Sequence, residues 1–258
     1  MSISLTVQDG IATVLISRPE RLNAIDLSMR SALQKTWQLI ANDPQIHVAI
    51  VTGAGTKAFS AGADLREGGN ASESFATQTF ANNHNGSLTW GMEIDKPLIC
   101  AFNGLAMGGG LEIGLACDIR IASRTAIFSL PEVQVGTMPG SGGTQRLVRT
   151  VGAANALSML LTGESIDAEH ALRIGLVSLL CEPDEVQDQA KRLAVRIRNN
   201  APLSVRAIKR VVRLGRELPL DIALSMERMA WGVIRDTEDR TEGRKAFAEK
   251  RRPAYKGR

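Results

Sequence analysis

Two short β-rich segments, each ending in glycine, constrain the fold more than any other feature of this 258-residue sequence. They are "HVAIVTG" at 47–53 and "PLICAFNG" at 97–104, and each is followed by further glycine and then a helix-like stretch. Two later runs, "DIRIAS" and "GLVSLL", are typical of further strands, and helical segments such as 184–198 separate the strand candidates. Strands that alternate with helices favour an α/β fold with parallel pairing.

The two ends of the chain depart from this alternation. Near the N-terminus, "ISLTVQDGIATVLIS" alternates in hydrophobicity on both sides of Asp9-Gly10, which predicts a β-hairpin. Asp26 then precedes a stretch whose apolar residues recur at helical spacing, so we expect it to cap a helix. No strand pattern remains in the last part of the chain, where amphipathic helices are expected. We therefore divide the sequence into a core (1–198) and a helical lobe (199–258).

Charge is divided unevenly along the sequence. Residues 1–190 hold 12 Lys and Arg against 19 Asp and Glu, whereas residues 191–258 hold 19 against 8. The body is therefore acidic and the tail is basic. Such a tail suits a nucleic acid, a phosphorylated ligand or the acidic body of a neighbouring subunit, and it is also typical of a solvated helical face.

The residue inventory disfavours several kinds of site. The three cysteines match no C-x-x-C spacing, and the three histidines lie far from one another and from any G-x-S-x-G motif. We therefore expect no disulfide framework, no metal site and no histidine-based triad, which leaves acid–base chemistry to carboxylates. No apolar leader opens the sequence and no window is long and apolar enough for a membrane span, so we expect a cytoplasmic protein with no membrane partner.

The glycine-rich turns after the two strands are the first candidate binding elements. They are "GAGTKAFSAGADL" at 53–65 and "GLAMGGGLEIGLACD" at 104–118. Glycine lets a ligand approach the backbone, and a helix that starts at such a turn leaves amide N–H groups without partners. Either turn alone is also typical of an ordinary tight connection. Facing each other, the two would form an oxyanion hole, in which amides near Ala63 and Gly109 bind the oxygen of a thioester or similar carbonyl.

Two glutamates lie in apolar surroundings. Glu112 follows Gly109 by three residues, in the first turn of an otherwise apolar helix, and Glu132 follows Pro131 shortly before another glycine-rich turn. A glutamate in a first turn can simply cap its helix, because the helix dipole favours negative charge there. Two carboxylates in dry surroundings can instead hold different protonation states, so that one acts as an acid and the other as a base.

Four longer blocks, taken together, resemble the enoyl-CoA hydratase (crotonase) superfamily. They are "AFSAGADL", "NGLAMGGGLEIGLACDIRIAS", "PEVQVGTMPGSGGTQRL" and "EGRKAFAEKR", and the 20-residue interval between Glu112 and Glu132 is that of true hydratases. The resemblance spans essentially the whole chain. It implies an α/β spiral of repeated ββα units with a C-terminal helical lobe used for oligomerisation, usually as a trimer or a dimer of trimers.

The activity that this resemblance implies is the reversible addition of water across the 2,3-double bond of an enoyl-CoA thioester, as in fatty-acid β-oxidation or related acyl-CoA degradation. No cofactor is expected besides the coenzyme A of the substrate. The amides of Ala63 and Gly109 match the oxyanion-hole positions. Glu112 and Glu132 match the catalytic pair, with Glu112 expected to hold and activate the water and Glu132 to give a proton to the α-carbon. Gly140 matches a position whose backbone helps to hold that water.

Further positions match those that contact coenzyme A in the family. Within one subunit they are Leu22, Ala63, Asp64, Leu65 and Arg66. Phe247 and Lys250 match an aromatic residue and a lysine that reach the nucleotide end from an adjacent subunit. Cationic partners for the phosphates would account for part of the basic tail.

Other interpretations differ from that of a hydratase. The ending "AFAEKRRPAYKGR" resembles that of carnitinyl-CoA dehydratases, which makes dehydration of a polar hydroxyacyl-CoA the nearest alternative, with enoyl-CoA isomerisation beside it. "VTGAGTKA" fits a weak dinucleotide fingerprint but lacks the long helix and the acidic residue that should follow. The arginine-rich stretch 191–216 would suit RNA but has no interleaved aromatic residues, so nucleic acid is disfavoured. The segment 66–90 is expected to line the acyl pocket, and the acyl group stays open.

Overall fold

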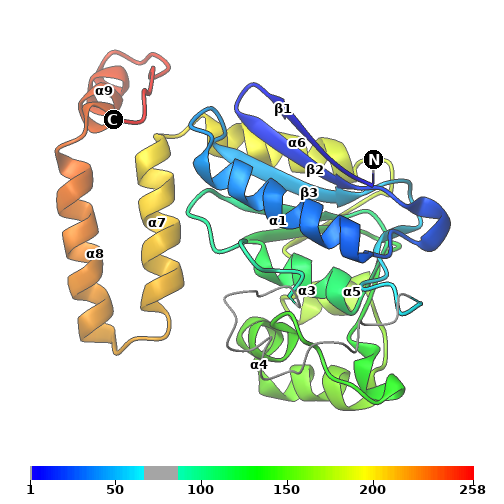
Figure 1. The fold of residues 1–258 in the computed structure, drawn as a ribbon. Coiled ribbons are helices and arrows are strands. Elements are labelled where there is room, and N and C mark those ends of the chain that lie inside the picture. The colour runs from blue at the N-terminus through cyan, green and yellow to red at the C-terminus, as the bar shows by residue number, and fades with distance from the viewer. Residues whose placement is uncertain (1, 67–86) are drawn as a thin grey trace.

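The computed structural model describes residues 2–66 and 87–258, which form two β-sheets surrounded by helices (Figure 1). The larger sheet has the order β1-β2-β3-β5-β7-β10. Its strands are β1 (Ile3–Gln8), β2 (Ile11–Ile16), β3 (Val48–Gly53), β5 (Leu98–Phe102), β7 (Ile119–Ser123) and β10 (Leu179–Cys181). β1 is antiparallel to β2, and each further neighbouring pair is parallel. The predicted hairpin and the parallel α/β arrangement are confirmed.

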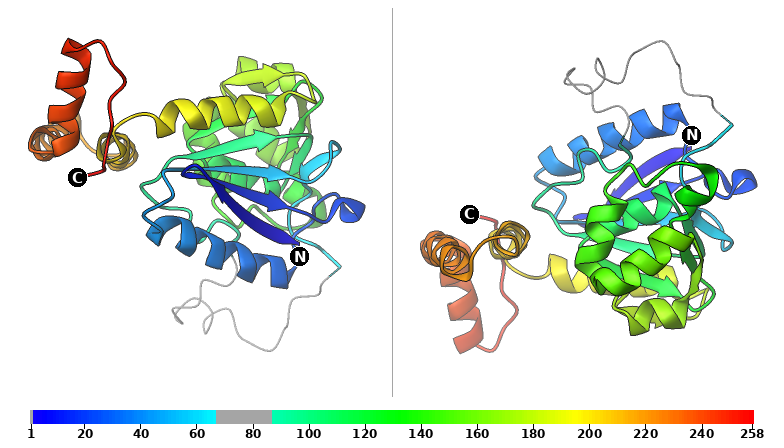
Figure 2. Two further views of the ribbon diagram at one scale, coloured as in Figure 1. Left: turned by 90° about the horizontal axis from the view of Figure 1, so that it is seen from above. Right: turned by 90° about the horizontal axis from the view of Figure 1, so that it is seen from below.

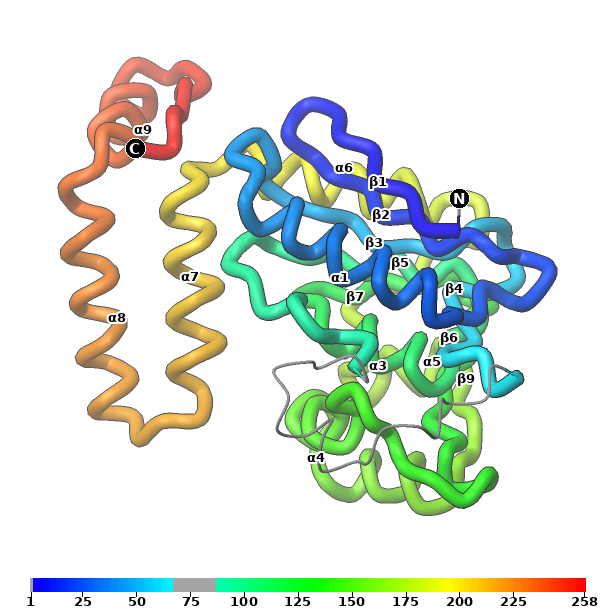
Figure 3. Tube along the Cα trace, in the orientation of Figure 1, coloured from blue at the N-terminus to red at the C-terminus, as the bar shows by residue number. Residues whose placement is uncertain are grey.

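A second, smaller sheet lies beside the first, next to α3 and α5 (Figure 3). Its strands, in the order β4-β6-β8-β9, are β4 (Ala58–Ser60), β6 (Leu105–Met107), β8 (Ile127–Ser129) and β9 (Ile166–Asp167). Three times the chain leaves a strand of the larger sheet and enters the smaller one, from β3 to β4, from β5 to β6 and from β7 to β8. Helices α3 (Gly109–Ala116) and α4 (Gly143–Thr162) follow the last two crossings, as the expected ββα spiral requires.

Two helices cover opposite faces of the larger sheet (Figure 2). α1 (Leu27–Asn42) buries its apolar stripe on one face, and α6 (Val186–Arg198) packs on the other. Successive residues of β3 alternate between these two cores, and both faces being covered explains why the strand is a continuous apolar run. The predicted cap of α1 is also confirmed, because the Asp26 carboxylate accepts a hydrogen bond from the Met29 amide at 2.8 Å.

The C-terminal helices stand to one side of this body (Figures 1 and 2). They are α7 (Pro202–Gly215), α8 (Leu220–Arg235) and α9 (Glu238–Ala248); the remaining short helices of the described chain are η1 (Pro19–Arg21), η2 (Pro131–Val135) and α5 (Ala168–Arg173). No residue of α7 or α8 is buried. The division of the chain at residues 198 and 199 into a core and an oligomerisation lobe stays a prediction.

Part of the basic excess of the tail is matched by the body of the same chain. The Lys209 ammonium donates a hydrogen bond to the Asp118 carboxylate at 2.6 Å, and Arg210 pairs with Asp95. These contacts join α7 to the residue that precedes β7 and to the loop that precedes β5. Within the two described ranges, no helix combines the length and the apolar character that crossing a membrane demands.

Candidate active site

Glu112 lies in the first turn of α3, a helix that is buried along almost its whole length. Its carboxylate binds a different segment: Oε1 accepts hydrogen bonds from the amides of Ser141 at 2.7 Å and Gly143 at 2.8 Å. The residue is only 3% exposed. Burial raises the pKa of this carboxyl, whereas the two amides and the positive charge of Arg146 offset part of the rise. The glutamate is therefore anchored from outside its own helix.

Glu132 approaches the start of the same helix from η2. A methyl group added to Gly108, the residue before α3, would lie 3.1 Å from Glu132 Oε1. The other carboxylate oxygen, Oε2, is buried and has no hydrogen-bond partner among the described residues. Burial raises the pKa of Glu132, and the negative charge of Glu112 raises it further. The structure thus brings the two glutamates of the predicted pair into one site.

Two backbone amides beside these carboxylates have no hydrogen-bond acceptor among the described residues and are placed to bind an oxygen. Ile25 and Ala63 form a parallel bridge, in which Ile25 N–H donates to Gly62 O and Asp64 N–H donates to Ile25 O. Alternate amides of a bridged segment point in opposite directions, so the Ala63 N–H faces away from the bridge. Gly109 is the first residue of α3, where an N–H has no partner within the helix. Neither amide donates a hydrogen bond within the described ranges, and a methyl group on Gly109 would lie 3.6 Å from Ala63 N.

One prediction about the oxyanion hole, concerning its local secondary structure, is wrong. The sequence predicted that a helix begins at each glycine-rich turn, but no helix begins between β3 and residue 66. The chain enters β4 instead, and the bridge to Ile25 is what turns the Ala63 amide outward. Of the predicted pocket segment 66–90, residues 67–86 lie outside the described chain.

The predicted water-binding position, Gly140, is exposed and lies on the turn that anchors Glu112. Its neighbour Ser141 and the following Gly143 supply the two amides that hold the carboxylate. Neither residue was predicted from the sequence, although the glycines of "MPGSGG" indicated the turn. The role of Gly140 toward water stays a prediction.

The positions predicted to contact coenzyme A within one subunit lie next to one another, where the loop that contains Leu22 meets the run 63–66. The Leu22 carbonyl accepts a hydrogen bond from the Ala61 amide at 2.9 Å, which places its loop against the start of the 63–66 run. Leu65 is 78% exposed. The Asp64 carboxylate is already engaged, because it pairs with Arg18 at 2.8 Å and accepts a hydrogen bond from the Arg66 amide. The Asp64 side chain therefore links the run 63–66 to Arg18.

Phe247 and Lys250 lie apart from the glutamates within one chain. Phe247 is on α9 and Lys250 follows that helix, and α9 lies at the far end of the helical lobe from α3 and α4 (Figure 1). The Phe247 side chain is 88% exposed. Within one chain, Phe247 and Lys250 are therefore not brought together with the two glutamates.

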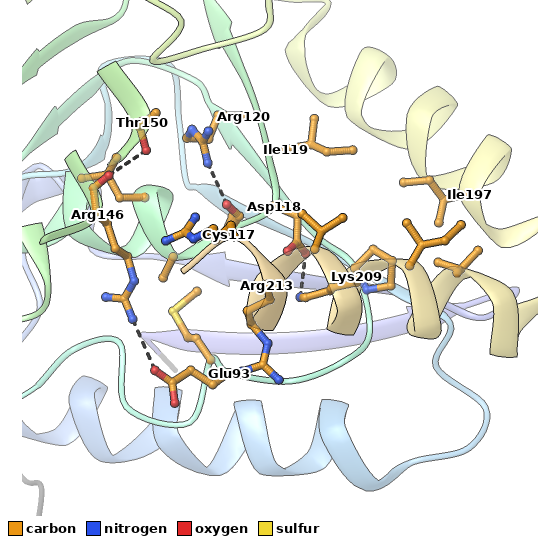
Figure 4. Close-up of a pocket in the computed structure, with 18 of the residues that line it drawn as sticks. Glu93, Cys117, Asp118, Ile119, Arg120, Arg146, Thr150, Ile197, Lys209 and Arg213 are labelled. Atoms are coloured by element: carbon orange, nitrogen blue, oxygen red, sulfur yellow. Dashed lines mark hydrogen bonds and ion pairs between the residues drawn. The ribbon is translucent and has the colours of Figure 1, made fainter. Parts of the chain in front are cut away.

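A separate cavity of about 560 Å³ lies between the body and α7 (Figure 4). Among its lining residues are Glu93, Asp118, Arg146 and Lys209, whereas neither Glu112 nor Glu132 belongs to the lining. Arg146 pairs with Glu93 there at 3.7 Å. In the part of the chain that the structure describes, no three His, Cys, Asp or Glu side chains are grouped as metal ligands are.

The chain is similar to known proteins along its whole length. Residues 6–258 match the family model described as enoyl-CoA hydratase/isomerase. The chain is 46% identical over 257 residues to the (E)-benzylidenesuccinyl-CoA hydratase of Thauera aromatica, with all of both chains covered, and 40% identical to the short-chain-enoyl-CoA hydratase of Clostridium acetobutylicum, covering 97% of this chain and 96% of that one. The crystal structure of an enoyl-CoA hydratase from Bacillus anthracis superimposes with a TM-score of 0.92 at 36% identity over the full length of both chains.

Proposed function

Because the chain belongs to the enoyl-CoA hydratase/isomerase family, we propose specific roles for Glu112, Glu132 and the amides of Ala63 and Gly109 in the hydration of an enoyl-CoA. The protein is an enoyl-CoA hydratase, a hydro-lyase that adds water reversibly across the 2,3-double bond of an enoyl-CoA thioester. Its substrate is accordingly an acyl-CoA.

The amides of Ala63 and Gly109 bind the thioester oxygen in this proposal. Attack of water at the β-carbon moves negative charge onto that oxygen as an enolate forms. Two N–H donors that are already in place stabilise the charge without reorganisation, and loss of one such donor typically costs about 10²- to 10³-fold in rate. The proposal is supported by the proximity of the two amides and by their lack of partners within the described chain.

Glu112 holds and activates the water, and Glu132 delivers the proton to the α-carbon. Burial raises the pKa of both carboxyls, and the support for the assignment is the difference in their hydrogen-bond partners. Glu112 accepts two amide hydrogen bonds, which favour the ionised form needed in a base. Glu132 has an oxygen without a partner in the described chain, and both burial and its neighbour's charge raise its pKa, which favours the protonated form needed in an acid.

The observation that carries this assignment is the convergence of both carboxylates and both amides on the first turn of α3. It is tested by following the ultraviolet absorbance of crotonyl-CoA, an unsaturated thioester, with no added cofactor. Wild type should remove the enoyl signal, and Glu112→Gln and Glu132→Gln should each lower turnover by about 10²- to 10⁴-fold. Turnover by either variant at the wild-type rate would refute the role of that glutamate.

An acyl group larger than crotonyl is the first to test beyond it. The relative from Thauera aromatica is named for (E)-benzylidenesuccinyl-CoA, and its 46% identity over the whole chain supports including that aryl-substituted thioester among the substrates. The ratio of kcat/KM for the aryl-substituted thioester and for crotonyl-CoA decides between them. A ratio above one would assign the protein to the degradation of aromatic acyl-CoA compounds, and a ratio far below one would assign it to short straight chains.

We also propose that the protein acts in the cytoplasm as a trimer or a dimer of trimers. Apolar side chains on α7 and α8 support an assembly, because Ile208, Val212, Trp231 and Val233 are each more than half exposed in the single chain. In such an assembly Phe247 and Lys250 would reach the nucleotide end of coenzyme A bound to a neighbour. Light scattering should give three or six times the 27.8 kDa mass of the chain, and a monomer would refute this part.

A further inference from the structure

Ser141 uses all three of its polar groups, and together they contact α3, the Leu88–Thr89 segment and Arg146 of α4. Its amide donates to Glu112 Oε1, as described above. Its hydroxyl accepts a hydrogen bond from the Leu88 amide at 2.8 Å. Its carbonyl accepts hydrogen bonds from the Thr89 hydroxyl and from Arg146 Nη1, both at 2.8 Å. Ser141, Leu88 and Thr89 are at most 5% exposed, so water does not replace these contacts readily.

The segment tied to Ser141 also covers one donor of the oxyanion hole. The Leu88 side chain packs so closely on Gly109 that its Cδ1 occupies the space where any larger residue would place a Cβ. Leu88 therefore forms a wall at the Gly109 amide, while its own amide is fixed by the Ser141 hydroxyl. A displacement of Ser141 would move this wall and the Glu112 anchor together.

Arg146 lies in the first turn of α4 and contacts the outer side of the glycine-rich loop that contains Ser141. Its Nη1 donates to Ser141 O and to Thr89 Oγ1, the latter at 3.2 Å, and its Nη2 pairs with Glu93. The guanidinium lies across Gly142, where a methyl group would be 3.0 Å from Arg146 Cζ and where φ is +97°. Glycine at this position allows both the backbone turn and the approach of the guanidinium. The planar fork of arginine suits two such acceptors better than a lysine would.

We propose that Ser141 and Arg146 are positioning residues, which fix the Glu112 carboxylate relative to the oxyanion hole by tying its anchoring turn to the Leu88–Thr89 segment. Neither residue touches the reacting atoms. They act on the rate because a misplacement of about 1 Å in a catalytic group can cost about 100-fold. The inference rests on the role proposed above for Glu112.

The test compares Ser141→Ala, Arg146→Gln and Arg146→Lys with wild type in the crotonyl-CoA assay. Arg149→Gln is the matched control, because Arg149 lies one turn further along α4 and pairs with Glu217 at the surface. Steady-state rates are measured across the pH range. Binding of butyryl-CoA, a saturated thioester that cannot be hydrated, is measured by calorimetry, and thermal unfolding shows that each variant is folded.

We expect Ser141→Ala and Arg146→Gln to lower kcat by about 10- to 100-fold while KM and the Kd of butyryl-CoA stay within about twofold. Arg146→Gln should also move the acidic limb of the rate profile to higher pH, because the positive charge that lowers the pKa of Glu112 is lost. Arg146→Lys keeps the charge and should return that limb toward the wild-type position. Arg149→Gln should behave as wild type.

Three results would overturn the proposal: unchanged kcat in Ser141→Ala and Arg146→Gln, a loss of kcat matched by an equal loss of thioester binding, or the same loss in Arg149→Gln. Should Ser141→Ala fail to fold, the comparison of Arg146→Gln with Arg146→Lys still decides the question through the pH profile. If Glu112→Gln is fully active, the proposed function fails. If Glu112→Gln is inactive while Ser141→Ala and Arg146→Gln match wild type, only this inference fails.

Discussion

Replacing Glu112 by glutamine and by alanine separates the chemistry of this side chain from its contribution to the fold. Both amide hydrogen bonds end on one oxygen, Oε1, so the carbonyl oxygen of a glutamine can accept both. Hydrogen bonds to a charged acceptor are worth about 1.5–3 kcal/mol and those to a neutral one about 0.5–1.5 kcal/mol, so the exchange weakens each bond by about 1 kcal/mol. Removing a charge that is costly to bury offsets this loss. We therefore expect the free energy of unfolding of Glu112→Gln to lie within about 1 kcal/mol of wild type.

Glu112→Ala has a different consequence, because it leaves the Ser141 and Gly143 amides without an acceptor in a buried place. Each unpaired buried donor costs about 1–3 kcal/mol, so the expected loss is about 2–6 kcal/mol. With about 2–4 °C of Tm per kcal/mol for a chain of this size, alanine should lower Tm by at least about 4 °C and glutamine by no more than that. Thermal and urea unfolding, run beside the crotonyl-CoA assay, measure both effects. A glutamine variant as unstable as the alanine variant would refute the reasoning, since the negative charge itself would then be the anchor.

The difference in stability between wild type and Glu112→Gln should depend on pH, and the structure gives the sign of that dependence. The folded state raises the pKa of Glu112 above its ordinary value of 4.5, so between that value and the raised pKa the folded protein binds more protons than the unfolded chain. Stability attributable to this group therefore falls as pH rises through that window and is constant above it. Glu112→Gln has no such group, so its stability relative to wild type should increase from pH 4 upward and then level off. A stability difference that does not change with pH would contradict the raised pKa.

Three further changes test other parts of the structure. Gly109→Ala places a methyl group onto the Leu88 side chain. We expect kcat/KM to fall at least about tenfold and the free energy of unfolding to fall by about 1–3 kcal/mol because of overpacking. Wild-type kinetics would show that the Leu88 side chain moves aside. Lys209→Met removes the partner of Asp118 and should loosen α7, which faster limited proteolysis within that helix would report; an unchanged cleavage rate would mean that the ion pair does not hold the helix. Lys250→Ala should raise KM for the CoA thioester several-fold at constant kcat, and a fall in kcat alone would remove this lysine from coenzyme A binding.

The sequence was sufficient to predict the larger sheet because its strands carry strong signals. β3 and β5 are covered on both faces, so both are largely apolar; β3 ends at Gly53, and Gly104 follows β5 by two residues. The strands of the smaller sheet have two or three residues each, which is too short for an alternating pattern to be recognised. Missing β4 led to the incorrect expectation of a helix that begins within the first glycine-rich turn.

Some residues of the candidate site could likewise be predicted from the sequence, and others could not. Glu112 was identifiable because a carboxylate in an apolar helix is unusual, and Gly109 because three glycines precede that helix. Ser141 carried no such signal. Its partners Glu112 and Leu88 lie 29 and 53 residues away in the sequence, and a serine in a glycine-rich turn is ordinary. Contacts of this kind depend on how the loops meet in three dimensions, which local patterns do not specify.

The two glutamates differ in how firmly they are placed relative to the oxyanion hole. Glu112 and the Gly109 donor belong to one turn of α3, so the regular geometry of the helix sets their separation, and the Ser141 turn fixes the remaining freedom of the side chain. Glu132 comes from η2, a separate element, and one of its oxygens has no partner in the described chain. The carboxylate proposed to activate water is thus rigidly coupled to the oxyanion donor, whereas the one proposed to deliver the α-proton keeps an oxygen free for the substrate. This arrangement fits the chemistry, because the attacking water must be aligned with a fixed β-carbon, while the acid needs a proton-bearing oxygen that no protein group already occupies.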